Sequence, residues 1–241
     1  MTRRRWIADE WDERTAVLKG EQAAHLIRVL RAQSGMEYDM VAGGRVWRAV
    51  ISDVGVDSVV FALLSEIEAE AALPVTLLLS VFKFDRMEWI IEKGTELGAE
   101  RFVPVTARRS EKHLVQAAPA RVERWRRVAR EAAKQSRRSD VPKVEDVVTL
   151  KAGVRIKAHP PGLNLLLAER ERSMTLSDSL KQADAGYTAV HLAVGPEGGW
   201  TTEEEALFGS EDWQAVSLGP RILRAETAGI AAMAVVAAFI G

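Results

Sequence analysis

The chain contains no cysteine, and this absence excludes several kinds of chemistry. There is no disulfide framework, no thiolate nucleophile and no cysteine-ligated metal. Histidine is scarce as well: His25, His113, His159 and His191 lie far apart, so we expect no metal site. His191 alternates with apolar neighbours, which favours a buried histidine whose hydrogen bonds are satisfied. A chain without cysteine suits a reducing compartment, and we expect a cytoplasmic protein.

The signatures of several common enzyme classes are also missing. The sequence has no G-x-x-x-x-G-K-[ST], G-x-G-x-x-G, G-x-S-x-G or H-E-x-x-H, which disfavours phosphate-loop, dinucleotide-binding, hydrolase and zinc-protease readings. Residues 1–6 are basic but no apolar segment follows them, so we expect no signal peptide. The apolar run 228–240 is shorter than the roughly 20 residues of a membrane-spanning helix. We therefore expect no membrane contact and read that run as a buried or interface helix.

Neither sign of charge is in excess, because the formal net charge is −1. The basic residues are nevertheless segregated: residues 121–138 hold eight of them and only two acidic ones. A long helix is expected over residues 119–137, with a buried stripe formed by Val122, Trp125, Ala129 and Ala132. The basic side chains lie off that stripe. A local patch is what polyanion binding needs, so we favour a phosphate-contacting face over a merely solvated one.

The pattern along the chain predicts two domains. Residues 1–72 read as short strands with a hairpin at 42–44, which indicates a small β-barrel. Residues 73–241 alternate apolar strands with helices, which predicts an α/β domain with a mostly parallel sheet. Asp85 and Glu88 would form a capping box for the first helix of that domain.

Two glycine-rich loops are the most informative feature of the chain. The apolar run 190–194 ends in Gly195-Pro196-Glu197-Gly198-Gly199. Thr201 and Thr202 then offer N-caps for an acidic helix start, with Glu204 and Glu205 three positions on. Some twenty residues later, the apolar run 216–218 ends in Gly219 and the segment up to Glu226. Loops at the carboxyl ends of parallel strands are where ligands bind in open α/β sheets. From the residues alone, ligand binding and a plain strand-to-helix turn are about equally supported.

These two loops resemble the closing motifs of the 16S ribosomal RNA uridine-N3 methyltransferase family, whose members are SPOUT methyltransferases. Residues 25–31, 92–99, 104–110 and 131–142 are similar to further family segments in the same order, so the resemblance covers nearly the whole chain. It implies a parallel sheet with a C-terminal trefoil knot, preceded by a PUA-like RNA-binding barrel. It also implies a homodimer, and 16S ribosomal RNA or the small ribosomal subunit as partner.

The resemblance assigns the glycine loops to S-adenosyl-L-methionine. The residues expected to hold it are Leu192, Gly195, Pro196, Glu197, Gly198, Gly199, Leu218, Gly219, Ile222 and Leu223. A cation near the uridine would stabilise the anion that forms when N3 loses its proton, and Arg224 is the first candidate. Glu197 and Glu226 are the nearest carboxylates for a base, although both could instead organise the loops.

The expected RNA contacts are basic residues in both domains. Arg138 matches a family arginine, whereas Lys134 and Arg137 stand where the family usually has glutamate and glycine. The predicted contacts are Arg5, Arg28, Arg31, Arg126, Arg130, Lys134 and Arg138. The alternative function is an RNA-binding ribosome-assembly protein that keeps the fold but has lost catalysis. A nucleotide-phosphate enzyme is disfavoured because the phosphate-binding motifs are missing.

Overall fold

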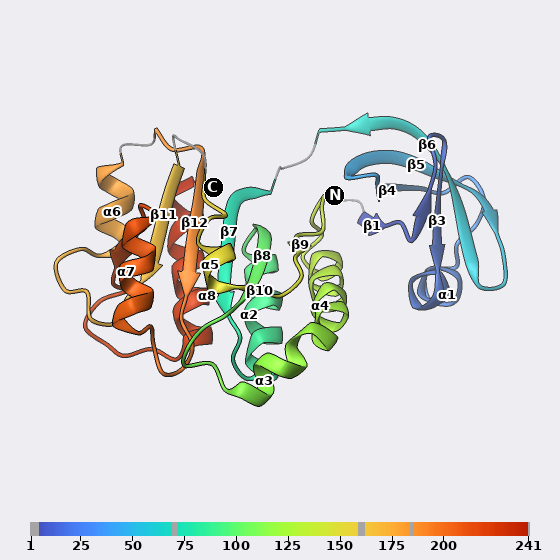
Figure 1. The fold of residues 1–241 in the computed structure, drawn as a ribbon. Helices are drawn as coiled ribbons and strands as arrows, with labels where there is room; N and C mark the ends of the chain where they lie inside the picture. Colours follow the sequence, from blue (N-terminus) through green and yellow to red (C-terminus); the bar gives the residue numbers. More distant parts are fainter. Residues whose placement is uncertain (1–4, 69–71, 159–161, 184–185, 241) are drawn as a thin grey trace. The chain divides into compact units, whose positions relative to one another are not determined.

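The computed structural model describes residues 5–68, 72–158, 162–183 and 186–240 (Figure 1). The chain forms two compact units. The first contains the described residues of 1–71 together with Ala133–Val141, and the second contains those of 72–132 and 142–241.

The first unit is built on a curled mixed sheet of six strands (Figure 1). The strands are β1 (Arg5–Ile7), β2 (Glu10–Trp11), β3 (Thr15–Lys19), β4 (Glu37–Ala42), β5 (Arg45–Val54) and β6 (Ser58–Ile67), with α1 (Gly20–Arg28) between β3 and β4. Their order is β1-β4-β5-β6-β3-β2, in which β1 and β4 are parallel and the other pairs antiparallel. The predicted hairpin at 42–44 joins β4 to β5. The barrel-like sheet is confirmed, and its hydrogen-bonded path stays open between β1 and β2.

The second unit contains a parallel sheet of seven strands, as the alternating pattern predicts. Its order is β10-β8-β7-β12-β11-β13, with β9 paired to β8. The strands are β7 (Leu73–Ser80), β8 (Ala99–Thr106), β9 (Lys143–Val144), β10 (Val148–Thr149), β11 (Gly162–Leu167), β12 (Ala189–Val194) and β13 (Gln214–Val216). In β7, Leu77, Leu78 and Leu79 are all buried, because helices cover both faces of the sheet.

The helices form two layers around this sheet (Figure 1). They are α2 (Phe84–Glu96), α3 (Lys112–Ala117), the 3₁₀ turn η1 (Ala118–Arg121), α4 (Val122–Gln135), α5 (Leu150–Gly153), α6 (Leu176–Gln182), α7 (Thr202–Ser210) and α8 (Ala225–Ile240). Side chains of α2, α4, α6 and α8 pack with Leu77 and Leu79, whereas α5 and α7 pack with Leu78. Helix α8 returns from the β13 edge to contact α2, α6 and β12. The trefoil knot stays a prediction from the resemblance.

Three local predictions can be compared with the structure. Of the two N-caps that the sequence offers, Thr201 is the one used, and it forms the capping box of α7 with Glu204. The capping box at Asp85 and Glu88 is wrong: α2 begins at Phe84, its N-cap Lys83 makes no side-chain cap, and Glu88 accepts hydrogen bonds from Arg124 instead. The helix expected over residues 119–137 is η1 followed by α4, and its predicted stripe is buried.

A cavity between three loops

A cavity of about 550 Å³ lies in the second unit at the carboxyl ends of β11, β12 and β13. Both predicted glycine loops line it, although β12 and β13 are not neighbours, because β11 lies between them in the sheet. A third loop, residues 168–174 after β11, therefore contributes to the wall. Sequence reasoning missed this loop because it carries no glycine.

Ten of the predicted cofactor and catalytic residues line this cavity. They are Gly195, Pro196, Glu197, Gly198, Gly199, Leu218, Gly219, Ile222, Leu223 and Arg224. Leu192 is placed elsewhere: it is fully buried in the middle of β12, among the side chains that pack against the helices. The strand continues for two residues beyond Leu192 before the glycine loop begins, so its side chain belongs to the core.

Glycine is required in these loops for two reasons, a positive φ angle at some positions and limited space at another. Gly199 and Gly219 have φ angles of +68° and +104°, which L-residues rarely adopt. At Gly198 the constraint is space, because an added Cβ would lie 3.3 Å from Cβ and Cδ of Arg109. The loops thus keep their main chain bare where it faces the cavity.

Arg109 fastens the loop that follows β12. Its Nη1 donates to the carbonyl oxygens of Gly198 at 2.8 Å and Trp200 at 3.0 Å. The Trp200 indole donates in turn to the carbonyl of Leu167 at 3.2 Å. The β8–α3 loop therefore holds the glycine loop by main-chain contacts. The only sequence signal for Arg109 is its place in the family-like segment 104–110.

Arg86 connects two carboxylates beside the cavity. Its Nη1 forms an ion pair with Glu197, and its Nε lies 3.5 Å from Oε1 of Glu226. Glu226 is buried, and its Oε2 has no hydrogen-bond partner within the described part of the chain. Glu197 would have to leave Arg86 before it could accept a proton from a substrate. The arrangement favours the loop-organising role for Glu197, and Arg86 is a site residue that sequence reasoning missed.

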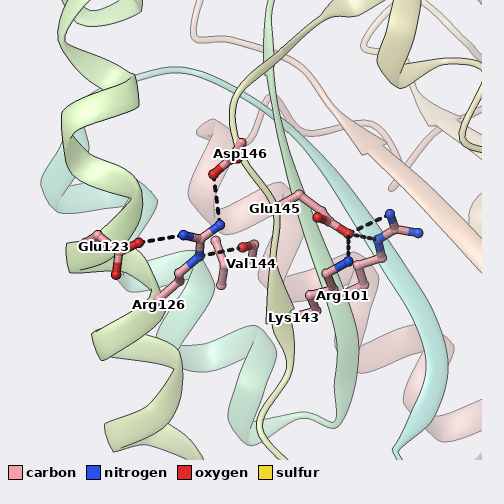
Figure 2. A network of polar contacts seen from close by, with 7 residues as sticks. All are labelled: Arg101, Glu123, Arg126, Lys143, Val144, Glu145 and Asp146. Atoms are coloured by element: carbon pink, nitrogen blue, oxygen red, sulfur yellow. Dashed lines mark hydrogen bonds and ion pairs between the residues drawn. The ribbon is translucent and has the colours of Figure 1, made fainter.

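The guanidinium of Arg126 is occupied within the protein (Figure 2). It donates to Glu123, to Asp146 at 2.8 Å and to the carbonyl of Val144 at 3.0 Å. Beside it, Glu145 forms ion pairs with Arg101 and Lys143 (Figure 2). This network, residues 101, 123, 126 and 143–146, joins α4 to the strand segment after it, so Arg126 acts here as a structural clamp.

Some of the other predicted RNA-contacting residues interact within the protein, and the rest are exposed. Arg138 pairs with Asp140 at 2.7 Å and its side chain is only 9% exposed, while Arg5 donates to the carbonyl of Arg137 at 2.9 Å. Lys134 is half-buried and also interacts within the protein. The exposed members are Arg28, Arg31 and Arg130.

No group of three or more histidine, aspartate and glutamate side chains in the described residues could hold a metal ion. His191 is buried, with Nδ1 2.9 Å from the carbonyl oxygen of Ile156, as expected, and His159 lies outside the described residues. None of the helices described is long and apolar enough to cross a bilayer.

Comparison with known proteins places the chain among RNA-modifying enzymes. Residues 69–237 match the model of an RNA methyltransferase domain. Ribosomal RNA small subunit methyltransferase E of Synechocystis sp. is 39% identical to this chain over 95% of it and 74% of that protein. The Bacillus subtilis protein of the same name is 30% identical over 92% of this chain and 89% of its own length.

Solved structures share the fold. The small subunit methyltransferase E of Neisseria gonorrhoeae, bound to S-adenosyl methionine, superposes with a TM-score of 0.79 at 28% identity, covering 97% of this chain and 96% of that one. A Legionella pneumophila structure in complex with the same cofactor gives 0.80 at 27% identity, over 99% and 98% of the two chains.

Proposed function

This chain belongs to the RNA methyltransferase domain family, and we propose that it transfers a methyl group from S-adenosyl-L-methionine to N3 of a uridine in 16S ribosomal RNA. The observation that carries the proposal is the cavity walled by both glycine loops. The relatives named small subunit methyltransferase E, one of them solved with S-adenosyl methionine, support the cofactor and the RNA substrate.

The cavity suits an adenosine-containing cofactor. Its walls combine bare main chain at Gly195, Gly198 and Gly199 with the apolar side chains Leu218, Ile222 and Leu223. Ligand sites of this kind are mostly apolar and use a few main-chain amides and carbonyls to fix orientation. A Cβ added at Gly198 would press on Arg109, so this glycine lets Arg109 approach and hold the loop.

The chemistry needs a positioned nucleophile and a cation. The bond from sulfur to the methyl carbon breaks as the bond to N3 forms, and the N3 proton leaves to a base or to water. N3 pairs in a duplex, so the uridine must arrive unpaired or flipped out. Arg224 is exposed on the cavity wall and makes no ion pair within the described residues. It is therefore available to stabilise the uridine anion through O2 or O4.

The proposed partners are RNA and a second copy of the chain. We propose residues 1–72 as a PUA-like RNA-binding domain, residues 73–241 as the methyltransferase domain, and a cytoplasmic location. In α8, the only charged residue, Glu226, is buried, and Ala234, Ala238 and Phe239 are exposed. An uncharged exposed helix face supports a homodimer. Sedimentation should then give about twice the 26.6 kDa chain mass.

Calorimetry with S-adenosyl-L-methionine tests the proposal at the cavity. We expect saturable binding, and no binding of ATP, because the phosphate-loop motif is missing from the sequence. An RNA-binding assembly protein without catalysis would bind neither. Absence of cofactor binding would therefore remove the methyltransferase proposal and leave that alternative.

A further inference from the structure

The loop after β11 is fastened at both ends to β13 and the residue after it. The amide of Ala168 donates to the carbonyl of Val216 at 3.0 Å. At the other end, the amide of Ser217 donates to Met174 and the amide of Leu176 donates to Ser217, both at 2.9 Å. The loop of residues 168–174 is thus fixed against the start of the β13–α8 loop, and both loops line the same cavity.

Glu171 closes the tip of this loop. Its Oε1 accepts the amide of Ser173 at 2.6 Å, the Ser173 hydroxyl at 2.5 Å and the amide of Met174 at 3.0 Å. These hydrogen bonds lower the pKa of the Glu171 carboxyl to about 2, so it stays ionised. The one carboxylate between Arg170 and Arg172 therefore accepts hydrogen bonds within the loop and forms no ion pair with either neighbour.

Arginine is concentrated around this cavity in a protein whose formal net charge is −1. Three glutamates line it, Glu169, Glu197 and Glu205, against six arginines: Arg86, Arg109, Arg170, Arg172, Arg221 and Arg224. Arg86 is paired with Glu197, and Arg109 with main-chain carbonyls. The remaining four are exposed and make no ion pair with any described residue. Arg126 and Arg138, by contrast, are engaged.

We propose that Arg170, Arg172 and Arg221 form an arginine rim that binds RNA phosphates on either side of the target uridine. The proposal rests on the function proposed above and names the surface that receives the RNA strand. Arginine presents a planar fork of donors that matches phosphate oxygens. Ile222, next to Arg221, leaves 78% of its surface exposed, which adds an apolar platform beside a cation. A nucleotide could place its flat base on the Ile222 side chain and its phosphate against the Arg221 guanidinium.

Salt-dependent RNA binding tests the arginine rim. The triple variant Arg170→Gln, Arg172→Gln, Arg221→Gln is compared with wild type on unmethylated 16S ribosomal RNA transcribed in vitro. The slope of log Kd against log salt should fall by ~0.7 for each lost contact, or about 2 for the triple variant. Replacing the same three residues with lysine keeps the charge and should restore most of the slope.

Lys151→Gln provides the matched control, because Lys151 is exposed on α5 in the same unit and lies away from the cavity. It should bind RNA as wild type does. Cofactor calorimetry on each variant shows that the cavity is still formed. A glutamine triple variant that keeps the wild-type slope overturns the rim, even if wild type methylates RNA. A wild-type protein that transfers no methyl group at all contradicts the proposed function itself.

Discussion

At the scale of single residues, the cavity depends on main-chain conformation at a few positions. Gly219 and Gly209 show this by contrast, because a Cβ added at either would meet no atom within 4 Å. They differ in backbone, since only Gly219 has a positive φ, at +104°. A methyl group added at Gly219 therefore strains the loop but meets no other protein atom.

The Gly219→Ala variant should bind S-adenosyl-L-methionine about tenfold more weakly, since a residue forced into a disfavoured φ costs of order 1–3 kcal/mol. Calorimetry measures this directly. Gly209→Ala is the control and should keep the wild-type Kd, because Gly209 lies in helix α7 without a positive φ. Equal Kd values for the two variants would show that the Gly219 conformation does not shape the site.

Arg224 is the residue to test for chemistry. Arg224→Ala should lower the single-turnover methylation rate by ~10²–10³ if the guanidinium acts as an oxyanion-type donor to the uridine anion. RNA affinity should change little, because the arginine rim remains. Rapid quench with saturating RNA and cofactor separates the two effects. A normal rate in this variant would assign the stabilising role to another group, and Arg86 would be examined next.

At the scale of elements, the sequence predicted structure best where the determinants are local. The capping box of α7 needs only Thr201 and Glu204, one of the two pairs that the spacing indicated. The start of α2 is set by distant residues instead. The Phe84 ring packs 5.9 Å from that of Trp125, and the Arg121 guanidinium lies 5.0 Å above it. No spacing rule within residues 83–88 could show those contacts, so the capping box at Asp85 was the wrong choice.

The basic face of α4 shows the same limit. Its buried stripe was predicted correctly from periodicity, but two of the three partners of Arg126, Val144 and Asp146, lie in a later segment of the chain (Figure 2). Arg126→Ala should lower the free energy of unfolding by about 1 kcal/mol, since it removes a hydrogen bond to a main-chain carbonyl and partly exposed ion pairs. Denaturant unfolding measures it.

Arg127→Ala is the control for that experiment, because the Arg127 side chain is exposed and makes no hydrogen bond or ion pair with a described residue. Its stability should stay within about 0.5 kcal/mol of wild type. If Arg126→Ala instead leaves stability unchanged and weakens RNA binding as much as the rim variant does, the clamp assignment is wrong.

The loop after β11 should respond to acid. The pKa of Glu171 is lowered from its usual 4.5 to about 2 by hydrogen bonds from Ser173 and Met174. A lowered pKa in the folded state means that the stabilisation is complete above about pH 4.5 and disappears as the pH falls toward 2. The amide signals of Ser173 and Met174 in NMR spectra should therefore titrate with a midpoint near 2.

Glu171→Gln should abolish that titration while the amides elsewhere in the sheet keep their signals. A midpoint near the ordinary glutamate value would mean that the turn is not formed in solution. The arginine rim would then lack the fixed loop on which it depends.

At the scale of the whole molecule, the alternation of strands and helices in residues 73–241 could be predicted, but the neighbours of each strand in the sheet could not. The two glycine loops follow β12 and β13, and β11 lies between these two strands. Because β11 has this central position, the loop 168–174 that follows it lines the cavity and brings its arginines there. Likewise, Ala133–Val141 group with the first unit, although α4 runs without a break from the second. Pairing between distant segments decides both features, and one sequence carries no pattern for it.

The most direct test of the account is the product of the reaction. Small ribosomal subunits from a strain lacking this protein are incubated with the purified chain and deuterium-labelled S-adenosyl-L-methionine, and the nucleosides of the RNA are analysed by mass spectrometry. The account predicts labelled 3-methyluridine at a single position, and much less of it with Arg224→Ala. Label on a ribose oxygen or another base, or no label in the RNA, would contradict it.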